Sequence, residues 1–222
     1  MKKSIMIGIP VNRWLSPKFS ISLAKIVDYL RINDWTIDIN YDNGSILSSQ
    51  RNKIMQSAHK NEMHLLFVDS DMVFEADALA TLLNYYDYGD MLGGLCFMRR
   101  PPFKPVVFSE DLVDEEGVFR GYKFSDIPVY PFSCAGVGCA FLFIKYKIID
   151  KILEQYKWPF NHLEIKTGDV LGEDLSFMHR CNLMNLNIVC VPNVDINHIS
   201  ERIIGRFDHV AAIEKMAENN ES

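Results

Sequence analysis

The sequence has no apolar run long enough to cross a membrane and no excess of basic residues. Its longest strongly apolar stretches are residues 65–68 and 139–144, whereas a membrane-spanning helix needs about 20 apolar residues in a row. Lysine and arginine together number 23 against 29 for aspartate and glutamate, which gives a net charge of −6. Proteins that neutralise nucleic-acid phosphates normally carry a basic excess. We therefore expect no transmembrane segment and no nucleic-acid partner.

The cysteines form no C-x-x-C pair, and their number is odd. The five are Cys96, Cys134, Cys139, Cys181 and Cys190. This pattern favours reduced thiols over a disulfide framework or a zinc site. The expected location is the cytoplasm, or the cytoplasm of a host cell if the chain is viral or from a phage.

A secretory signal peptide and internal repeats are also missing. The first eleven residues have a basic start and an apolar run, but Gly8 and Pro10 interrupt that run and no small-residue cleavage site follows. This segment is typical of a first β-strand. With no repeat or low-complexity tract in 222 residues, the chain predicts one domain with a full core.

Apolar periodicity predicts an α/β fold. Strands are expected at residues 4–9, 35–39, 63–68 and 91–95, and they alternate with helices that begin at Ser16-Pro17 and span residues 48–60 and about 75–86. Residues 96–133 hold more than half of the nine prolines and predict an inserted hairpin. Strands at 139–144 and 188–191, and helices at 146–155, 172–185 and 207–217, are expected to follow. The alternation favours a mostly parallel sheet with helices on both faces.

Asp69-Ser70-Asp71 stands where the third expected strand ends. In an open parallel sheet this is the carboxyl edge, where ligands bind. Residues two apart in a strand point to the same face, so both carboxylates can face one divalent cation or its polar ligand. The alternative interpretation is that the two aspartates only cap the next helix.

Gly172-Glu173-Asp174 opens an expected helix, and His198 follows the last expected strand. Two acids in a first helical turn compensate the helix dipole, but Asp174 can also act as a general base toward a hydroxyl. His198 can be a structural histidine or a nitrogen ligand, which would favour Mn²⁺ over Mg²⁺. For each motif, the local pattern leaves the structural and the functional interpretation open.

Several arginines are candidates for binding a diphosphate or a base edge, because the guanidinium fork suits those groups. They are Arg51 beside Asn52, and Arg202 and Arg206 after His198. Arg99 and Arg100, which precede Pro101, are instead candidates for lining the substrate cleft. Each of them can equally be a solvated surface charge. The glycines Gly136 and Gly138 allow close backbone approach to a substrate, or mark a turn.

The sequence does not favour two classes of α/β enzyme, the nucleotidyltransferases and the D-x-D phosphohydrolases. A nucleotidyltransferase would carry a Gly-rich phosphate loop after the first strand, where residues 8–13 read Gly-Ile-Pro-Val-Asn-Arg. A D-x-D phosphohydrolase would place its nucleophilic aspartate after the first strand and follow the pair with Thr or Ser. Here the pair follows the third expected strand and precedes Met72.

The order of these motifs resembles that of the GT-A-fold, nucleotide-sugar-dependent glycosyltransferases, in particular the family-2-like group. The parts that carry the resemblance are a strand ending at Pro10, Arg51-Asn52, the D-x-D of residues 69–71, residues 136–144, Glu173-Asp174 and His198. The resemblance spans about residues 4–198. It implies a Rossmann-like GT-A domain over residues 1–206, with a nucleotide-binding half at about 1–95 and an acceptor half at about 96–206, followed by a helix and tail at 207–222.

The resemblance also implies roles for individual residues. Pro10, Arg51, Asp69, Asp71 and Arg202 would bind the nucleotide sugar. Asp71 and His198 would bind Mn²⁺ or Mg²⁺. Asp174 would serve as the catalytic base, with Glu173 beside it as a second catalytic candidate.

The implied reaction is the transfer of one sugar from a nucleotide-sugar donor, a UDP-sugar by expectation, to a hydroxyl of a glycan or other acceptor, with inversion at the anomeric carbon. The Q-x-x-R-W motif of processive synthases is absent, which favours single-sugar transfer. A retaining transferase and a non-catalytic module of the same fold that binds a sugar or nucleotide are the alternatives.

Overall fold

The first half of the chain folds as successive strand and helix units. The computed structural model describes residues 2–11, 15–166, 168–199, 203–211 and 213. Its first elements are β1 (Ser4–Pro10), α1 (Pro17–Ile32), β2 (Thr36–Asp42), α2 (Leu47–Lys60), β3 (His64–Val68), β4 (Met72–Val73), α3 (Ala78–Leu83), the 3₁₀ turn η1 (Tyr86–Tyr88) and β5 (Met91–Cys96). The predicted start of α1 is confirmed, since the Ser16 Oγ accepts a hydrogen bond from the Phe19 N–H at 3.0 Å.

The second half contains the insertion and the return to the sheet. Its elements are β6 (Val107–Leu112), α4 (Val113–Glu116), β7 (Val118–Gly121), η2 (Phe124–Asp126), β8 (Phe132–Cys134), β9 (Gly136–Val137), β10 (Phe141–Ile144), α5 (Tyr146–Gln155), β11 (Leu163–Glu164), β12 (Val170–Leu171), α6 (Glu173–Leu183), β13 (Ile188–Ile199) and β14 (Ile203–Ile204). The helix expected at 75–86 is shorter than predicted because i→i−3 bonds form at both ends, from the Ala78 N–H to the Glu75 carbonyl and from the Tyr85 N–H to the Leu82 carbonyl.

Within the described residues, nine strands form the central sheet, in the order β2-β1-β3-β10-β5-β13-β14 with β4 and β8 also paired to β13. β1 runs parallel to β2 and β3, and β13 runs parallel to β5. β10 lies antiparallel between β3 and β5. The predicted α/β fold with a mostly parallel sheet is confirmed.

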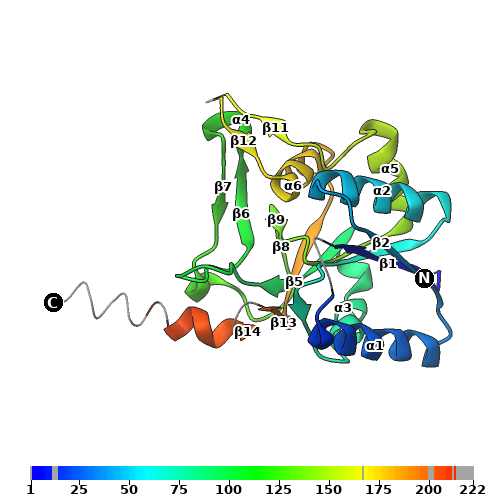
Figure 1. Ribbon diagram of the computed structural model, residues 1–222. Coiled ribbons are helices and arrows are strands. Elements are labelled where there is room, and N and C mark those ends of the chain that lie inside the picture. The colour runs from blue at the N-terminus through cyan, green and yellow to red at the C-terminus, as the bar shows by residue number, and fades with distance from the viewer. Residues whose placement is uncertain (1, 12–14, 167, 200–202, 212, 214–222) are drawn as a thin grey trace.

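Helices cover both faces of this sheet, as the pattern predicts (Figure 1). Successive residues of β1 and β3 alternate between the two cores: Ile7 and Leu66 face one, and Met6 and Leu65 face the other. α1 and α3 bury their apolar sides in the first core, and α2, α5 and α6 bury theirs in the second. Two cores separated by one sheet account for the strands being apolar on both sides.

The close contact between α2 and β1 depends on Gly8. A Cβ at this position would lie 2.3 Å from the Cγ2 of Ile54 on α2 and 3.0 Å from the Cδ1 of Leu65 on β3. Both neighbours are fully buried. Glycine therefore allows α2 to lie close against the sheet, and this places Arg51, three residues before Ile54, near the carboxyl edge.

The inserted segment folds as the expected hairpin, with an additional strand. β6 and β7 pair antiparallel, and β9 pairs with the other edge of β6 to form a separate sheet. Asp111 ties this sheet to α6, because its Oδ2 lies 2.9 Å from His179 Nδ1 and accepts a hydrogen bond from Asn182 Nδ2 at 2.8 Å. Figure 1 shows the hairpin standing beside the central sheet.

The last long strand extends further than residues 188–191. β13 runs to Ile199, and its pairing with β5 shifts register between Val191 and Asp195. Asn193, within this bulge, and Asp195 after it are exposed, whereas Val194 and Ile196 are buried, so the strand alternates again after an interruption at Pro192. His198 therefore lies within the strand and not after it.

At the C-terminal end, residues 206–211 and 213 are helical. The remainder of the helix and tail expected at 207–222 lies outside the described residues. Among the residues that the structure describes, none of the helices has the length and apolar character needed to span a bilayer.

The buried His64 predicts a pH-dependent stability. Burial lowers its pKa from 6.5 to about 4, and the charges of Lys2 and Lys145 act in the same direction. Because the unfolded chain then binds more protons between these values, the free energy of unfolding falls as the pH is lowered from 6.5 toward 4. The full effect of this histidine is about 3 kcal/mol, measurable by urea denaturation across this range.

His64→Asn is the matched control for this prediction. The ring Nδ1 accepts the Tyr146 N–H at 3.0 Å, and an asparagine amide oxygen can take over that role without titrating. The variant should lose less stability than the wild type between pH 6.5 and 4. Equal losses in the two proteins would contradict the assignment.

Candidate functional site

The carboxyl ends of the parallel strands meet where the D-x-D segment leaves β3. Asp69 follows the last residue of β3 directly, and its N–H donates to the Ala140 carbonyl at 3.0 Å. Pro10 ends β1 on the neighbouring strand, in register with Asp42 of β2. Both positions predicted from strand ends thus lie at the edge where α/β sheets bind ligands.

Arg51 is the most deeply buried charged residue in this region. Its side chain on α2 is 2% exposed, its Nη2 lies 2.8 Å from Asp69 Oδ1, and its Nε lies 3.7 Å from Glu173 Oε1. Burial alone would lower the pKa of Arg51, but the negative charges around it, Asp69 foremost, raise that pKa above its ordinary value. Arg51 therefore joins the end of β3 to the start of α6 as a permanent cation.

Glu173 and Asp174 form the first turn of α6, as predicted. The Oδ1 of Asp174 accepts a hydrogen bond from the Leu175 N–H at 2.8 Å. Burial and the neighbouring charge of Asp174 raise the pKa of Glu173, against the lowering effect of Arg51. The two acids share one region of negative potential, and Glu173 is the one in contact with Arg51.

Asp71 and His198 lie on adjacent segments. β13 pairs antiparallel with β4, which sets His198 opposite Met72, and the Ile199 N–H donates to the Asp71 carbonyl at 2.7 Å. The Nδ1 of His198 is buried and has no hydrogen-bond partner among the residues that the structure describes. Residues more than 120 positions apart in the sequence are thus brought side by side.

Arg99 was a candidate from the sequence, but its contact with Asp71 was not predicted. Its guanidinium forms an ion pair with the Asp71 carboxylate. Burial lowers the pKa of His198, and the positive charge of Arg99 lowers it further. Arg99 follows the end of β5 by three residues, so the signal in the sequence was its place after a strand that neighbours β13.

Asp69 is electrostatically coupled to both parts of the edge. Besides its ion pair with Arg51, its charge raises the pKa of Glu173 and of His198. Cys96 lies near the same charges: burial, Asp69 and Asp174 raise its pKa to about 12. We call Arg51, Asp69, Asp71, Glu173, Asp174 and His198 the carboxyl-edge cluster.

Other sequence candidates lie elsewhere. Arg202 lies outside the described residues, and Arg206 pairs with Asp195 at 2.7 Å and donates to the Pro192 carbonyl at 2.8 Å. A Cβ on Gly138 would lie 2.8 Å from the Cys96 Sγ. Close packing inside the protein therefore accounts for Gly138. The contacts of Arg206 are with residues of β13 and stabilise that strand.

The cluster offers few ligands for a metal ion. Across the described residues, no group of three or more His, Cys, Asp or Glu side chains is arranged to hold a metal. Asp71 and His198 are the two that fit, because one is a carboxylate and the other has a buried nitrogen with no hydrogen-bond partner in the described part of the chain. A cation held by two protein ligands would take its remaining ligands from a diphosphate and water.

Comparison with solved structures identifies the fold class of this chain. No protein-family model matches this chain, and no curated protein matches it by sequence. The solved structure of A197 from STIV matches with a TM-score of 0.55 and 18% identity, covering 89% of this chain and 86% of that one. GalNAc-T7, crystallised with UDP, GalNAc and Mn²⁺, matches with a TM-score of 0.53 and 9% identity, covering 89% of this chain and 43% of that one. The chain thus has a GT-A-like, Rossmann-like α/β fold.

Proposed function

We propose that this protein is a metal-dependent glycosyltransferase that moves one sugar from a nucleotide sugar, a UDP-sugar in preference to other donors, to a hydroxyl of a glycan or other acceptor. The observation that carries the proposal is the carboxyl-edge cluster. Three separate segments, residues 69–71, 173–174 and 198, bring their charged or ligating groups to one end of the parallel strands. The likeness to the fold of GalNAc-T7, which was crystallised with UDP and Mn²⁺, supports it.

The proposed donor site comprises Pro10, Arg51, Asp69, Asp71 and Arg202. Arg51 fixes the Asp69 carboxylate through a 2.8 Å contact, so that Asp69 is oriented before the nucleotide arrives. Asp71 and His198 are the residues that would hold Mn²⁺ or Mg²⁺. When bound, such a cation stabilises the negative charge of the departing diphosphate.

The proposed base is Asp174. Glycosyl transfer develops oxocarbenium character at the anomeric carbon, and a carboxylate that takes the proton of the acceptor hydroxyl assists attack from the opposite face. Glu173, the second catalytic candidate, already contacts Arg51 at 3.7 Å. This engagement leaves Asp174 as the better base and predicts inversion of configuration.

Asp71→Asn tests the metal site. In the wild type, a UDP-sugar and Mn²⁺ together should raise the melting temperature more than either alone. The variant loses a charged ligand, so its Mn²⁺-dependent affinity for the nucleotide should fall at least about tenfold, or about 1.4 kcal/mol. Thermal shift over a panel of sugar nucleotides, with and without Mn²⁺, measures this.

Asp77→Asn is the matched control, because Asp77 is exposed and its side chain makes no cap hydrogen bond to α3. It should behave as the wild type. An unchanged Mn²⁺ effect in Asp71→Asn would contradict the metal assignment.

Asp174→Asn tests the base. Because a general base contributes about 10²–10⁴ in rate, turnover measured by nucleotide release should fall at least about a hundredfold while nucleotide affinity stays within twofold of wild type. NMR of the product should show inverted configuration. Retained configuration would overturn the role of Asp174, and metal-dependent nucleotide binding without release on any acceptor would instead favour a binding module.

Arg99→Gln tests whether Arg99 competes with the cation. Its ion pair with Asp71 must break before that carboxylate can bind a metal, and a partly exposed pair is worth up to about 1 kcal/mol. Without nucleotide, the variant should therefore bind Mn²⁺ about fivefold more tightly, as measured by the EPR signal of free Mn²⁺. Arg100→Gln removes the same charge from the same exposed loop, and an equal gain in that control would refute the competition.

A further inference from the structure

A cavity of about 700 Å³ lies between the hairpin, the loop after β5 and the C-terminal helical residues. Figure 1 shows these three segments converging below β6 and β7. The volume is in the range of sites that bind small molecules. Its lining residues are Met98, Lys104, Pro105, Phe108, Phe119, Gly121, Tyr122, Lys123, Phe124, Ser125, His209, Val210 and Ile213.

The lining combines aromatic rings with positive charge. Four of the side chains are Phe or Tyr, and two are lysines, while the lining residues that the structure describes include no Asp, Glu, Asn or Gln. Acid-free lining is notable in a chain with a net charge of −6. A bare sugar would need carboxylates or amides to satisfy its hydroxyls, so the lining suits an apolar body that carries an anionic group.

The walls of the cavity are held in place by packing of their own. His209 is 4% exposed, its Nδ1 lies 3.0 Å from the Pro102 carbonyl, and its ring packs against Phe124 at 4.8 Å between centroids. The Phe108 and Phe119 rings pack edge to face at 5.5 Å. A preformed site loses little conformational entropy when a ligand binds.

One loop separates the cavity from the carboxyl-edge cluster. Met98 lines the cavity, and the next residue, Arg99, pairs with Asp71. A bridge between Phe97 and Pro105 closes this loop at its base. Since neighbouring Cα atoms are about 3.8 Å apart, the same loop lines the cavity and contacts Asp71 of the proposed donor site.

We infer that this cavity binds the apolar body of an anionic, amphipathic acceptor, whose hydroxyl then reaches the carboxyl-edge cluster. The class is a molecule with an acyl or aromatic body, a carboxylate or phosphate that Lys104 and Lys123 attract, and a free hydroxyl. The acceptor role rests on the proposed function, whereas the binding site itself does not. The transfer forms the glycosidic bond to that hydroxyl, releases the nucleoside diphosphate and passes the hydroxyl proton to Asp174.

The binding arm of the test uses two fluorescent probes without metal or nucleotide. The anionic probe 8-anilinonaphthalene-1-sulfonate should bind the wild type saturably at one site. In the double variant Lys104→Glu, Lys123→Glu its Kd should rise at least about tenfold, because two attractive charges become repulsive. The neutral probe N-phenyl-1-naphthylamine should bind both proteins within twofold.

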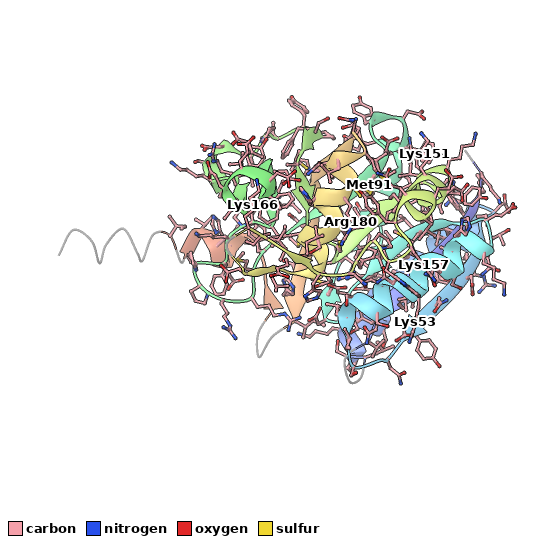
Figure 2. The ribbon with its side chains drawn as sticks, turned by 90° about the horizontal axis from the view of Figure 1, so that it is seen from above. Lys53, Met91, Lys151, Lys157, Lys166 and Arg180 are labelled. Carbon is pink, nitrogen blue, oxygen red and sulfur yellow. The ribbon has the colours of Figure 1, made fainter. Side chains whose placement is uncertain are left out.

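The control is Lys151→Glu, Lys157→Glu, which makes the same change in net charge on the α5 side of the molecule, away from the hairpin (Figure 2). It should leave both Kd values unchanged. Gly121→Trp fills the cavity from its wall, where a Cβ has only the Val107 carbonyl oxygen near it, at 3.9 Å, and should weaken both probes. Equal effects of the two lysine pairs, or no effect of Gly121→Trp in a folded protein, would overturn the site.

The acceptor arm uses 11-hydroxyundecanoate, which has a hydroxyl, an apolar body and a carboxylate. It should displace the anionic probe and increase Mn²⁺-dependent release of nucleotide from the sugar nucleotide, and the increase should be lost in Lys104→Glu, Lys123→Glu. Displacement with release that does not increase would overturn the acceptor role. Probe binding with no nucleotide release under any condition would instead contradict the proposed function.

Discussion

The buried ion pair between Arg51 and Asp69 is the interaction on which the arrangement of the site depends. A guanidinium that is 2% exposed is stable only where carboxylates and carbonyls replace its water. Asp69 at 2.8 Å and Glu173 at 3.7 Å supply the carboxylates, one from the end of β3 and one from the start of α6, and the Cys139 carbonyl accepts from Nη1 at 3.4 Å. Charge compensation therefore holds α2, β3 and α6 together at the edge where the reactive groups gather.

Much of the fold was predictable from the sequence because apolar periodicity is local. The β–α units, the helix α5 and the inserted hairpin were predicted, and the likeness to known folds agrees with them. Strand direction was not, because a buried strand such as β10 is apolar whichever way it runs. The length of β13 was underestimated because Pro192 and the exposed Asn193 interrupt the apolar run before the alternation resumes.

The candidate site was also predictable only in part. Each motif was visible in isolation, but the sequence could not say that Ile199 would bond to Asp71, or that Arg99 would occupy that carboxylate. These contacts are made by segments distant in the chain, so only topology brings them together. The cavity walls are equally scattered, from Met98 to Ile213, and no single stretch of sequence has the composition of a pocket.

The number of residues in the β13 bulge sets which face of the sheet the following side chains occupy. Side chains alternate every residue along a strand, so the number of residues between Val191 and Asp195 decides which of Asn197 and His198 faces the Asp71 side. Substitutions here preserve that parity, but the gain or loss of one residue would reverse it and turn the histidine to the other face of the sheet. For this short stretch, a change in length would therefore disturb the site more than a change of side chain.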